Sequence, residues 1–222
     1  MSKGQFIVIE GSDGSGKGTQ FELLAEYLRR TGNHVATFDF PQYTQPSSYF
    51  VQQYLNGRYG SADSLGAYGP SLFYALDRFD ASIKIREALE AGKIVLCNRY
   101  YGSNLAHQGQ KIDSEEDRKK YYDWLRDIEL TMLGIPEPDV NLVLVMPAEI
   151  AQGLVDRKEK RSYTDMKRDI HEADLNHLKR AVATFEELCE LYPKSFTPIY
   201  CTREESLKSI DEVHQEIIEA LK

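Results

Sequence analysis

Short apolar runs separated by longer amphipathic stretches recur along this chain. Runs of this length without polar alternation are typical of strands buried on both faces, as in a parallel sheet. Because helical stretches lie between the runs, the pattern predicts an α/β fold, with a five-stranded parallel sheet covered by helices on both faces. The expected strands are residues 6–9 (FIVI), 34–40 (HVATFDF), 93–97 (KIVLC), 140–146 (VNLVLVM) and 197–201 (TPIYC).

Apolar positions three and four residues apart predict several of the helices. The capping box at residues 114–117 (SEED) is expected to open one helix that runs to about residue 132. Another helix follows the first strand and is expected to stop at Gly32. Three apolar stripes predict inner helix faces: Phe21, Leu24, Ala25 and Leu28; Leu175, Leu178, Val182, Phe185 and Cys189; and Ile210, Val213, Ile217 and Leu221.

Two polar segments are expected to be loops. Residues 43–69 are rich in Tyr and Gly, and residues 156–165 (DRKEKRSYTD) are highly charged. Such segments in a compact domain are often lids or binding loops, and the alternative is a solvated surface excursion. No repeat or linker divides the chain, so we expect one domain over residues 1–222 with a mobile lid at about 156–170.

Composition restricts the class of protein. Hydrophobic residues make up 41% of the 222 residues, and no apolar stretch approaches the ~18 residues of a membrane span, so a soluble protein is expected. The N-terminus leaves no room for a secretion signal, which favours a cytoplasmic location. A net charge of -8 argues against a nucleic-acid binder. The three cysteines indicate buried thiols, with neither a disulfide framework nor a zinc site.

The glycine-rich run at residues 11–18 (GSDGSGKG) nearly completes the phosphate-binding pattern G-x-x-x-x-G-K-[ST]. It follows an apolar run and opens a helix, so its backbone N–H groups and the helix N-terminus would point at one anion. We therefore expect a P-loop NTPase fold, with Lys17 on the transferring phosphates. The expected ATP-binding residues are Gly11, Ser12, Asp13, Gly14, Ser15, Gly16, Lys17, Gly18 and Thr19.

Two residues of this loop affect how a Mg²⁺ ion could bind beside the phosphates. Gly18 replaces the hydroxyl that would bind Mg²⁺, and the next residue lies roughly 100° further round the helix. Mg²⁺ often uses one or two carboxylates together with waters and phosphate oxygens, and the candidates are Asp13, Glu10 and Glu172. Asp13 would repel a phosphate by about 1–4 kcal/mol. We expect it to bind a sugar hydroxyl of a second nucleotide, directly or through Mg²⁺ and water; the alternative is a turn-stabilising role.

Further cations and an aromatic residue indicate a binding site for a second nucleotide, the phosphate acceptor. Tyr74 and Arg78 share a helical face and could stack a base and donate to its carbonyl, although their spacing alone favours a structural aromatic and a salt-bridged arginine. Arg99 follows a buried strand, at the edge where α/β sheets bind ligands, and its fork suits a monophosphate. The cations of residues 157–161 fit a lid that neutralises charge during transfer, although a solvated charge run is the better interpretation of that segment alone.

Together these pieces resemble thymidylate kinase, a family of P-loop nucleoside monophosphate kinases that make dTDP from dTMP and ATP. The matching segments are FIVIEGSDGSGKGTQ, the FP of FDFPQY, LFYALDRF, NRYYGSNLAHQG and RDIHEAD, in this order over nearly the whole chain. The resemblance implies a phosphotransferase that uses ATP with Mg²⁺ and is usually a homodimer. It departs at Asn98, where the family usually has an Asp, at Gly18, at His107 in place of a common Tyr, and in FPQY, which lacks an Arg.

The resemblance also implies residue roles. Asp13 would lie near the sugar 3′-hydroxyl and the metal, and Gly14 indicates the kind of member whose catalytic arginine lies in the lid. The implied catalytic residues are Lys17, Asp13, Arg99, Arg157 and Arg161. The implied dTMP-binding residues are Asp13, Phe40, Tyr74, Arg78, Arg99, Ser103, Asn104, His107 and Gln108. Two alternatives remain: a kinase for another monophosphate such as dUMP, and a P-loop switch protein that is not a kinase.

Overall fold

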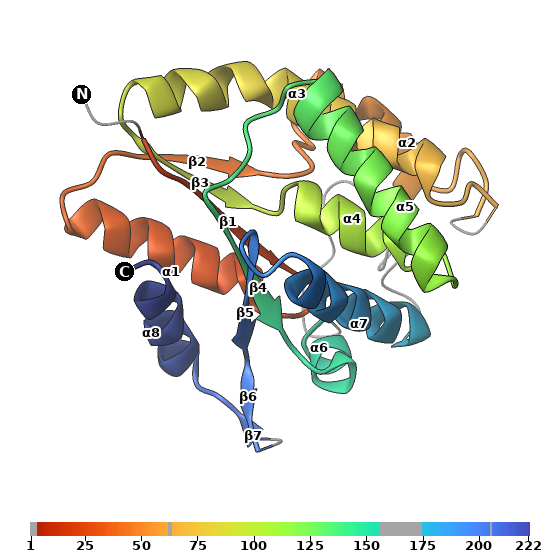
Figure 1. The fold of residues 1–222 in the computed structure, drawn as a ribbon. Helices are drawn as coiled ribbons and strands as arrows, with labels where there is room; N and C mark the ends of the chain where they lie inside the picture. Colours follow the sequence, from red (N-terminus) through yellow and green to blue (C-terminus); the bar gives the residue numbers. More distant parts are fainter. Residues whose placement is uncertain (1–3, 62–63, 156–174, 205) are drawn as a thin grey trace.

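A central sheet of five parallel strands organises the protein, with strand order β2-β3-β1-β4-β5 (Figure 1). The computed structural model describes residues 4–61, 64–155, 175–204 and 206–222. All five predicted apolar runs form these strands, which confirms the predicted sheet. The strands are β1 (Phe6–Gly11), β2 (Val35–Asp39), β3 (Ile94–Asn98), β4 (Val140–Val145) and β5 (Phe196–Tyr200).

Each face of the sheet carries its own hydrophobic core, because side chains alternate along each strand. Ile7 and Ile9 of β1 pack in the core that includes α1 (Lys17–Arg30) and α8 (Ile210–Ala220). Phe6 and Val8 pack in a second core on the other face, as expected for a sheet covered by helices on both faces. The helices that contribute to that second core are α3 (Tyr68–Glu90), α4 (Tyr101–Gly109), α5 (Glu115–Arg126) and α7 (Leu175–Leu191).

The predicted ends of the helices that contain residues 21–28 and 115–132 are confirmed, whereas one predicted inner-face residue is not. The Ser114 side chain caps α5, which continues through a π-helical turn, η2 (Asp127–Met132), to the expected end. Gly32 has a φ of 89°, which suits glycine just after α1. The prediction that Ile210 faces inward is wrong, since its side chain is 57% exposed. Its backbone carbonyl, and not its side chain, faces α1, where it accepts a hydrogen bond from Gln20.

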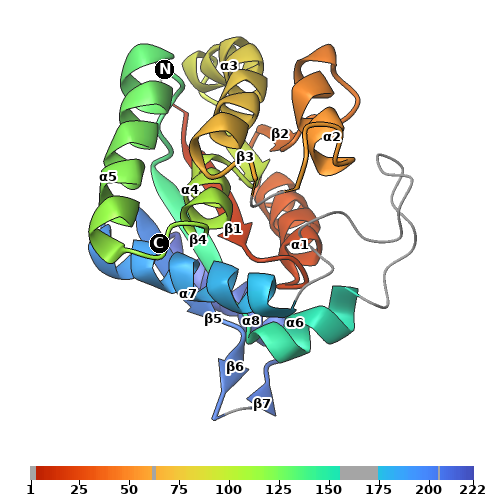
Figure 2. The ribbon, with the colours of Figure 1, turned by 90° about the vertical axis from the view of Figure 1, so that its right-hand side faces the viewer.

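The expected loop at residues 43–69 contains helical structure, so that prediction is wrong over residues 46–55 and over residues 68–69, where α3 begins. A short 3₁₀ helix, η1 (Pro46–Ser48), leads into α2 (Tyr49–Leu55). Val51, Tyr54 and Leu55 lie three and four residues apart and are buried in a small cluster against α3. Figure 2 shows α2 alongside α3. The proposed lid at 156–170, with Arg157, Arg161 and Glu172 at or near it, lies within residues 156–174 and so outside the described residues.

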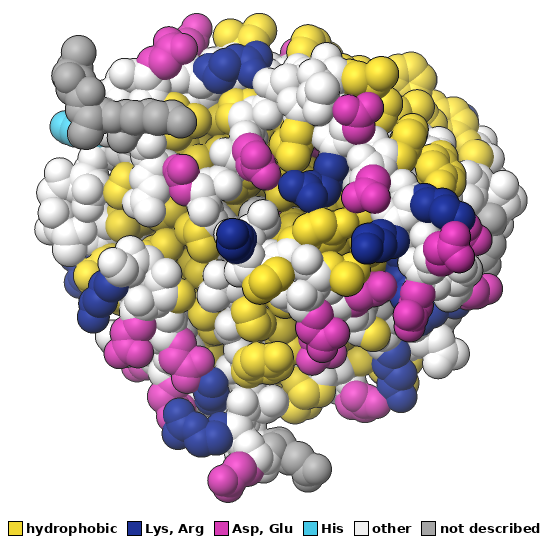
Figure 3. Space-filling model, in the orientation of Figure 1, with side chains coloured by type: hydrophobic (Ala, Val, Ile, Leu, Met, Phe, Trp, Pro, Cys, Tyr) yellow, Lys and Arg dark blue, Asp and Glu magenta, His cyan; other side chains and the backbone are white. Residues whose placement is uncertain are grey.

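One exposed apolar stripe runs along α3, and we call Leu72, Leu76, Phe79 and Ile83 the α3 stripe. Their exposed fractions range from 41% for Leu72 to 59% for Ile83. Figure 3 shows further hydrophobic side chains at the upper right, where Figure 1 places the neighbouring helix α2. An apolar surface of this kind often marks an interaction site.

The remaining elements are short. They are α6 (Ala148–Val155) after β4 and a two-stranded antiparallel pair, β6 (Thr202–Arg203) with β7 (Ser206–Leu207). Cys97, Cys189 and Cys201 are buried free thiols, as predicted. Among the described residues, no helix has the length and apolar character needed to cross a membrane.

Candidate active site

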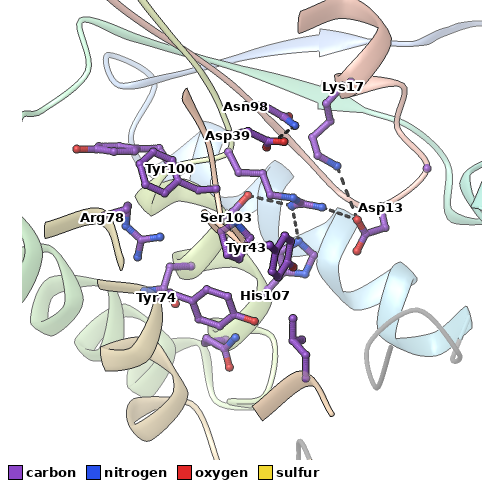
Figure 4. Close-up of a pocket in the computed structure, with 18 of the residues that line it drawn as sticks. Asp13, Lys17, Asp39, Tyr43, Tyr74, Arg78, Asn98, Tyr100, Ser103 and His107 are labelled. Atoms are coloured by element: carbon purple, nitrogen blue, oxygen red, sulfur yellow. Dashed lines mark hydrogen bonds and ion pairs between the residues drawn. The ribbon is translucent and has the colours of Figure 1, made fainter. Parts of the chain in front are cut away.

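A pocket of about 310 Å³ opens at the carboxyl ends of β1, β2 and β3. This volume lies within the range of small-molecule sites. Residues from the glycine-rich loop lie at one end and residues from α3 at the other (Figure 4). The pocket brings together these predicted site residues: Asp13, Gly14, Gly16, Lys17, Gly18, Phe40, Tyr74, Arg78, Arg99, Ser103, Asn104, His107 and Gln108.

The glycine-rich loop reverses the chain between β1 and α1. Gly14 and Gly16 have φ values of 77° and 85°, a region that favours glycine. A Cβ atom at Gly14 would lie 2.1 Å from the Ala151 carbonyl oxygen of α6, so position 14 has no room for an arginine. Lys17 begins α1, and its Nζ donates to the Ser12 carbonyl oxygen at 2.7 Å. The loop thus places the buried ammonium group of Lys17 at the N-terminus of α1.

The other predicted loop residues lie outside the pocket lining. Gly11 ends β1, and Ser12 and Ser15 are buried residues of the loop itself. Thr19 is exposed on α1. Their predicted contacts with ATP stay predictions.

Arg99 connects the loop to the opposite side of the pocket. It follows β3 directly and has a φ of 63°, a strained conformation for a residue other than glycine that is often found at functional sites. Its Nη2 donates to Asp13 Oδ1, and its Nη1 donates to the Gly11 carbonyl oxygen at 3.1 Å and to Ser103 Oγ at 3.0 Å. His107 Nε2 lies 3.1 Å from the same Nη1. The guanidinium is therefore fixed beside the glycine-rich loop.

Glu10 does not reach the pocket. Its carboxylate is fully buried and accepts hydrogen bonds from the Tyr100 backbone N–H at 2.9 Å and from Ser103 Oγ at 2.5 Å. Burial raises the pKa of Glu10, and the hydrogen bond from Ser103 opposes that rise. In this position Glu10 connects the turn between β3 and α4, which contains Arg99, to Ser103 in the first turn of α4.

Asp39 is a pocket carboxylate that sequence reasoning missed. It ends β2 opposite Asn98 of β3, and Asn98 Nδ2 donates to Asp39 Oδ1 at 2.8 Å (Figure 4). Burial raises the pKa of Asp39, and the hydrogen bond from Asn98 opposes that rise. Thus a carboxylate lies at this strand edge beside Asn98. The available signal was a charged residue at the end of an apolar run.

Arg78 and Tyr74 line the far end of the pocket from one face of α3. Arg78 also makes a two-point ion pair with Glu129, which is fully buried in η2. Burial lowers the pKa of Arg78, but the charge and hydrogen bonds of Glu129 raise it above its ordinary value on balance. Asn104 Nδ2 donates to the same Glu129 at 2.9 Å. Arg78 is therefore both the salt-bridged arginine and a pocket residue.

The carboxylates that line the pocket are chemically suited to a magnesium ion. Asp13 and Asp39 are carboxylates that line the pocket. Among the described residues, no three His, Cys, Asp or Glu side chains converge as a metal cage. Mg²⁺ needs only one or two carboxylates where phosphates and waters supply the other ligands. Asp13 and Asp39 could therefore hold a Mg²⁺ ion whose other ligands are phosphate oxygens and waters.

Comparison with known proteins places this pocket in a family. A family model described as thymidylate kinase matches residues 9–217. The chain belongs to the thymidylate kinase family. The thymidylate kinase of Mycobacterium tuberculosis is 34% identical over 185 residues, which cover 82% of this chain and 84% of the relative. The probable thymidylate kinase of Pyrococcus abyssi is 30% identical over 223 residues, covering 99% and 97%.

Solved structures of thymidylate kinases share the fold. The thymidylate kinase of Candida albicans matches with a TM-score of 0.72 over 100% of this chain and 92% of that chain, at 23% identity. The P-loop NTPase fold and the family expected from the sequence are thereby confirmed. As a member of the thymidylate kinase family, the chain is a phosphotransferase.

Proposed function

We propose that the protein transfers the γ-phosphate of ATP to dTMP, giving dTDP and ADP in dTTP biosynthesis. The supporting observation is that two anion-binding groups face one pocket: the glycine-rich loop with Lys17, and the Arg99 guanidinium. Tyr74 and Arg78 lie at the far end, where a base would stack and meet a hydrogen-bond donor. The pocket thus has the parts needed for a donor phosphate, an acceptor phosphate and a base.

In this proposal ATP binds on residues 11–19, and the acceptor phosphate binds Arg99. Phosphoryl transfer needs positioning and charge neutralisation, with in-line attack by an acceptor phosphate oxygen and no covalent enzyme intermediate. Asp13 binds the sugar 3′-hydroxyl. Other proposed dTMP contacts are Phe40, Ser103, Asn104, His107 and Gln108. Arg157 and Arg161 are the proposed lid arginines.

We also propose that Mg²⁺ enters with ATP. When bound, it would neutralise charge on the phosphates. Asp13 and Asp39 are the pocket carboxylates that would hold it or its waters. Of the other carboxylates expected from the sequence, Glu10 is enclosed behind the β3–α4 turn, and Glu172 lies outside the described residues.

A panel of monophosphates tests the proposed reaction. ADP release is measured with ATP and Mg²⁺ in the presence of dTMP, dUMP, AMP or CMP, and dTMP should give the highest kcat/KM. Comparable turnover of AMP or CMP would refute a preference for thymidylate. ATP hydrolysis that no acceptor stimulates would favour a nucleotide switch over a kinase.

The proposed setting is a cytoplasmic homodimer, with the α3 stripe as its contact surface. Symmetric dimers bring the same patch of both subunits together, and this contact would cover four exposed apolar side chains. Light scattering should give twice the mass of the 25.4 kDa chain, and Phe79→Glu should give monomers. A monomeric mass for the unmodified protein would refute the dimer without bearing on the reaction.

A further inference from the structure

Glu129 joins two residues that line the base end of the pocket, although it does not line the pocket itself. Its fully buried carboxylate accepts hydrogen bonds from Arg78 Nε and Nη2 and from Asn104 Nδ2. It lies in η2, where the backbone departs from α-helical geometry. Such π-helical turns are frequent at functional sites. Glu129 is thus placed to set how two pocket side chains point.

The Asn104 amide has only one chemically allowed orientation. A carboxylate accepts hydrogen bonds and cannot donate, so Asn104 must present its Nδ2 to Glu129. The same Nδ2 donates to the Ser71 carbonyl oxygen at 3.0 Å, and a carbonyl is also only an acceptor. Asn104 Oδ1 is buried and has no hydrogen-bond partner among the described residues. Because a buried acceptor without a partner is costly, Oδ1 calls for a donor from a ligand.

Glu129 fixes the Arg78 guanidinium in the same way. Two of its three nitrogens, Nε and Nη2, are bonded to the carboxylate. The third, Nη1, makes no hydrogen bond to a described residue and can only donate. The base end of the pocket therefore offers one donor, from Arg78, and one acceptor, from Asn104.

We propose that Glu129 is a positioning residue that makes the pocket select a base with a carbonyl next to a ring N–H. Thymine and uracil have this pair at O4 and N3, and guanine has it on its larger ring system. Cytosine and adenine present an amino group beside a ring acceptor, so donor would face donor and acceptor would face acceptor. This inference rests on the proposed transfer to dTMP and deepens it.

A matched pair of substrates tests the selection. dTMP and 5-methyl-dCMP have the same shape and the same methyl group, and they differ only at this edge of the base. Because a site built around buried hydrogen bonds rejects a mismatched partner strongly, kcat/KM should favour dTMP by roughly 10³-fold or more. A ratio below about tenfold would overturn the proposal, since one lost contact alone is worth that much.

The variant Glu129→Gln tests the role of the carboxylate. It replaces one acceptor oxygen with an N–H group, which must face a donor of Arg78 or Asn104 and loosens both side chains. The dTMP to 5-methyl-dCMP ratio should fall by about tenfold or more. The matched control is Glu187→Gln, because Glu187 accepts from Arg118 Nε and Nη2 in the same two-point geometry outside the pocket. The control should keep the unmodified ratio; an unchanged ratio in folded Glu129→Gln would overturn the proposal.

Circular dichroism establishes whether each variant is folded. If Glu129→Gln does not fold, Asn104→Ala is the deciding variant. Because it lacks the Oδ1 acceptor, its kcat/KM ratio of dTMP to 5-methyl-dCMP should be lower than that of the unmodified protein. An unchanged ratio would overturn the proposal. A protein that phosphorylates neither dTMP nor 5-methyl-dCMP would instead refute the proposed function. Turnover of dTMP with the same dTMP to 5-methyl-dCMP ratio in every variant would refute this inference and leave the proposed function standing.

Discussion

Arg99 Nη2 donates a hydrogen bond to Asp13 Oδ1, which joins the residue after β3 to the loop after β1. The same Asp13 oxygen lies 3.9 Å from Lys17 Nζ. The carboxylate thus lies between two cations, and their charges offset the repulsion that it would exert on a phosphate. This arrangement explains how an anion-binding loop tolerates an acid.

Lys17→Ala should abolish most phosphoryl transfer. The ammonium is the cation of the glycine-rich loop, and loss of one group that stabilises transition-state charge typically costs ~10²–10³ in kcat. A coupled assay of ADP release measures the change. Lys120→Ala is the control, since Lys120 is exposed on α5 and pairs only locally with Glu116 and Asp117. A Lys17→Ala protein that retained the unmodified kcat would contradict the assignment.

Arg99→Lys should weaken acceptor binding more than ATP binding. Lysine keeps the positive charge but lacks the planar fork that binds a phosphate at two points. We expect KM for dTMP to rise by about 10-fold to 100-fold, which corresponds to the loss of one or two charge-assisted hydrogen bonds. Steady-state kinetics with each substrate varied in turn separates the effects. Equal rises in KM for ATP and dTMP would contradict an acceptor-phosphate role.

Arg78→Ala should destabilise the fold as well as weaken dTMP binding. Removing the arginine leaves the fully buried Glu129 without its partner charge, and breaking a buried pair in this way costs about 3–5 kcal/mol. Urea unfolding measures the loss. Arg118→Ala is the comparison, because its partner Glu187 is 22% exposed and should tolerate the loss better. Equal losses in the two variants would contradict this account of Glu129.

Glu10 should make stability fall as pH rises. Burial raises its pKa in the folded protein above the usual 4.5. Between those two pKa values the folded chain binds more protons than the unfolded chain, so the free energy of unfolding decreases as pH increases. The contribution is fully present below pH 4.5 and is lost as pH rises through the folded pKa.

The variant Glu10→Gln cannot titrate, so its unfolding free energy should lose this part of the pH dependence. Urea unfolding from about pH 4.5 upwards, with Glu116→Gln as an exposed control, measures the difference between variant and unmodified protein. Identical pH slopes for Glu10→Gln and the unmodified protein would rule out Glu10 as the source.

The sheet and the glycine-rich loop could be predicted because their signals are local. Strands buried on both faces are continuous apolar runs, and Lys17 lies within a contiguous motif. By contrast, α2 was missed because its apolar spacing spans only Val51 to Leu55 within a polar, glycine-rich segment. A helix of seven residues carries too few turns to stand out from such surroundings.

The missed site residues act over long sequence separations. Glu129 meets Arg78 across 51 positions, and Asn98 meets Asp39 across 59. No periodicity in the sequence predicts such pairs. The Asn98–Asp39 pair depends on the strand order, and the Arg78–Glu129 pair depends on the position of η2. The position of Glu10 outside the pocket lining could not be predicted for a similar reason: its side chain bonds to the Tyr100 backbone and to Ser103, and only the folded β3–α4 turn reveals this.

Ser103 Oγ donates to Glu10 and accepts from Arg99. One hydroxyl therefore links the buried carboxylate of β1 to the guanidinium that lies beside the glycine-rich loop. An apolar substitution at position 10, made to raise thermal stability, would remove the acceptor of the Ser103 hydroxyl. The Arg99 guanidinium would then lose a fixed hydrogen-bond partner. Positions 10, 99 and 103 should therefore show strong epistasis, and libraries for directed evolution would have to vary the three together.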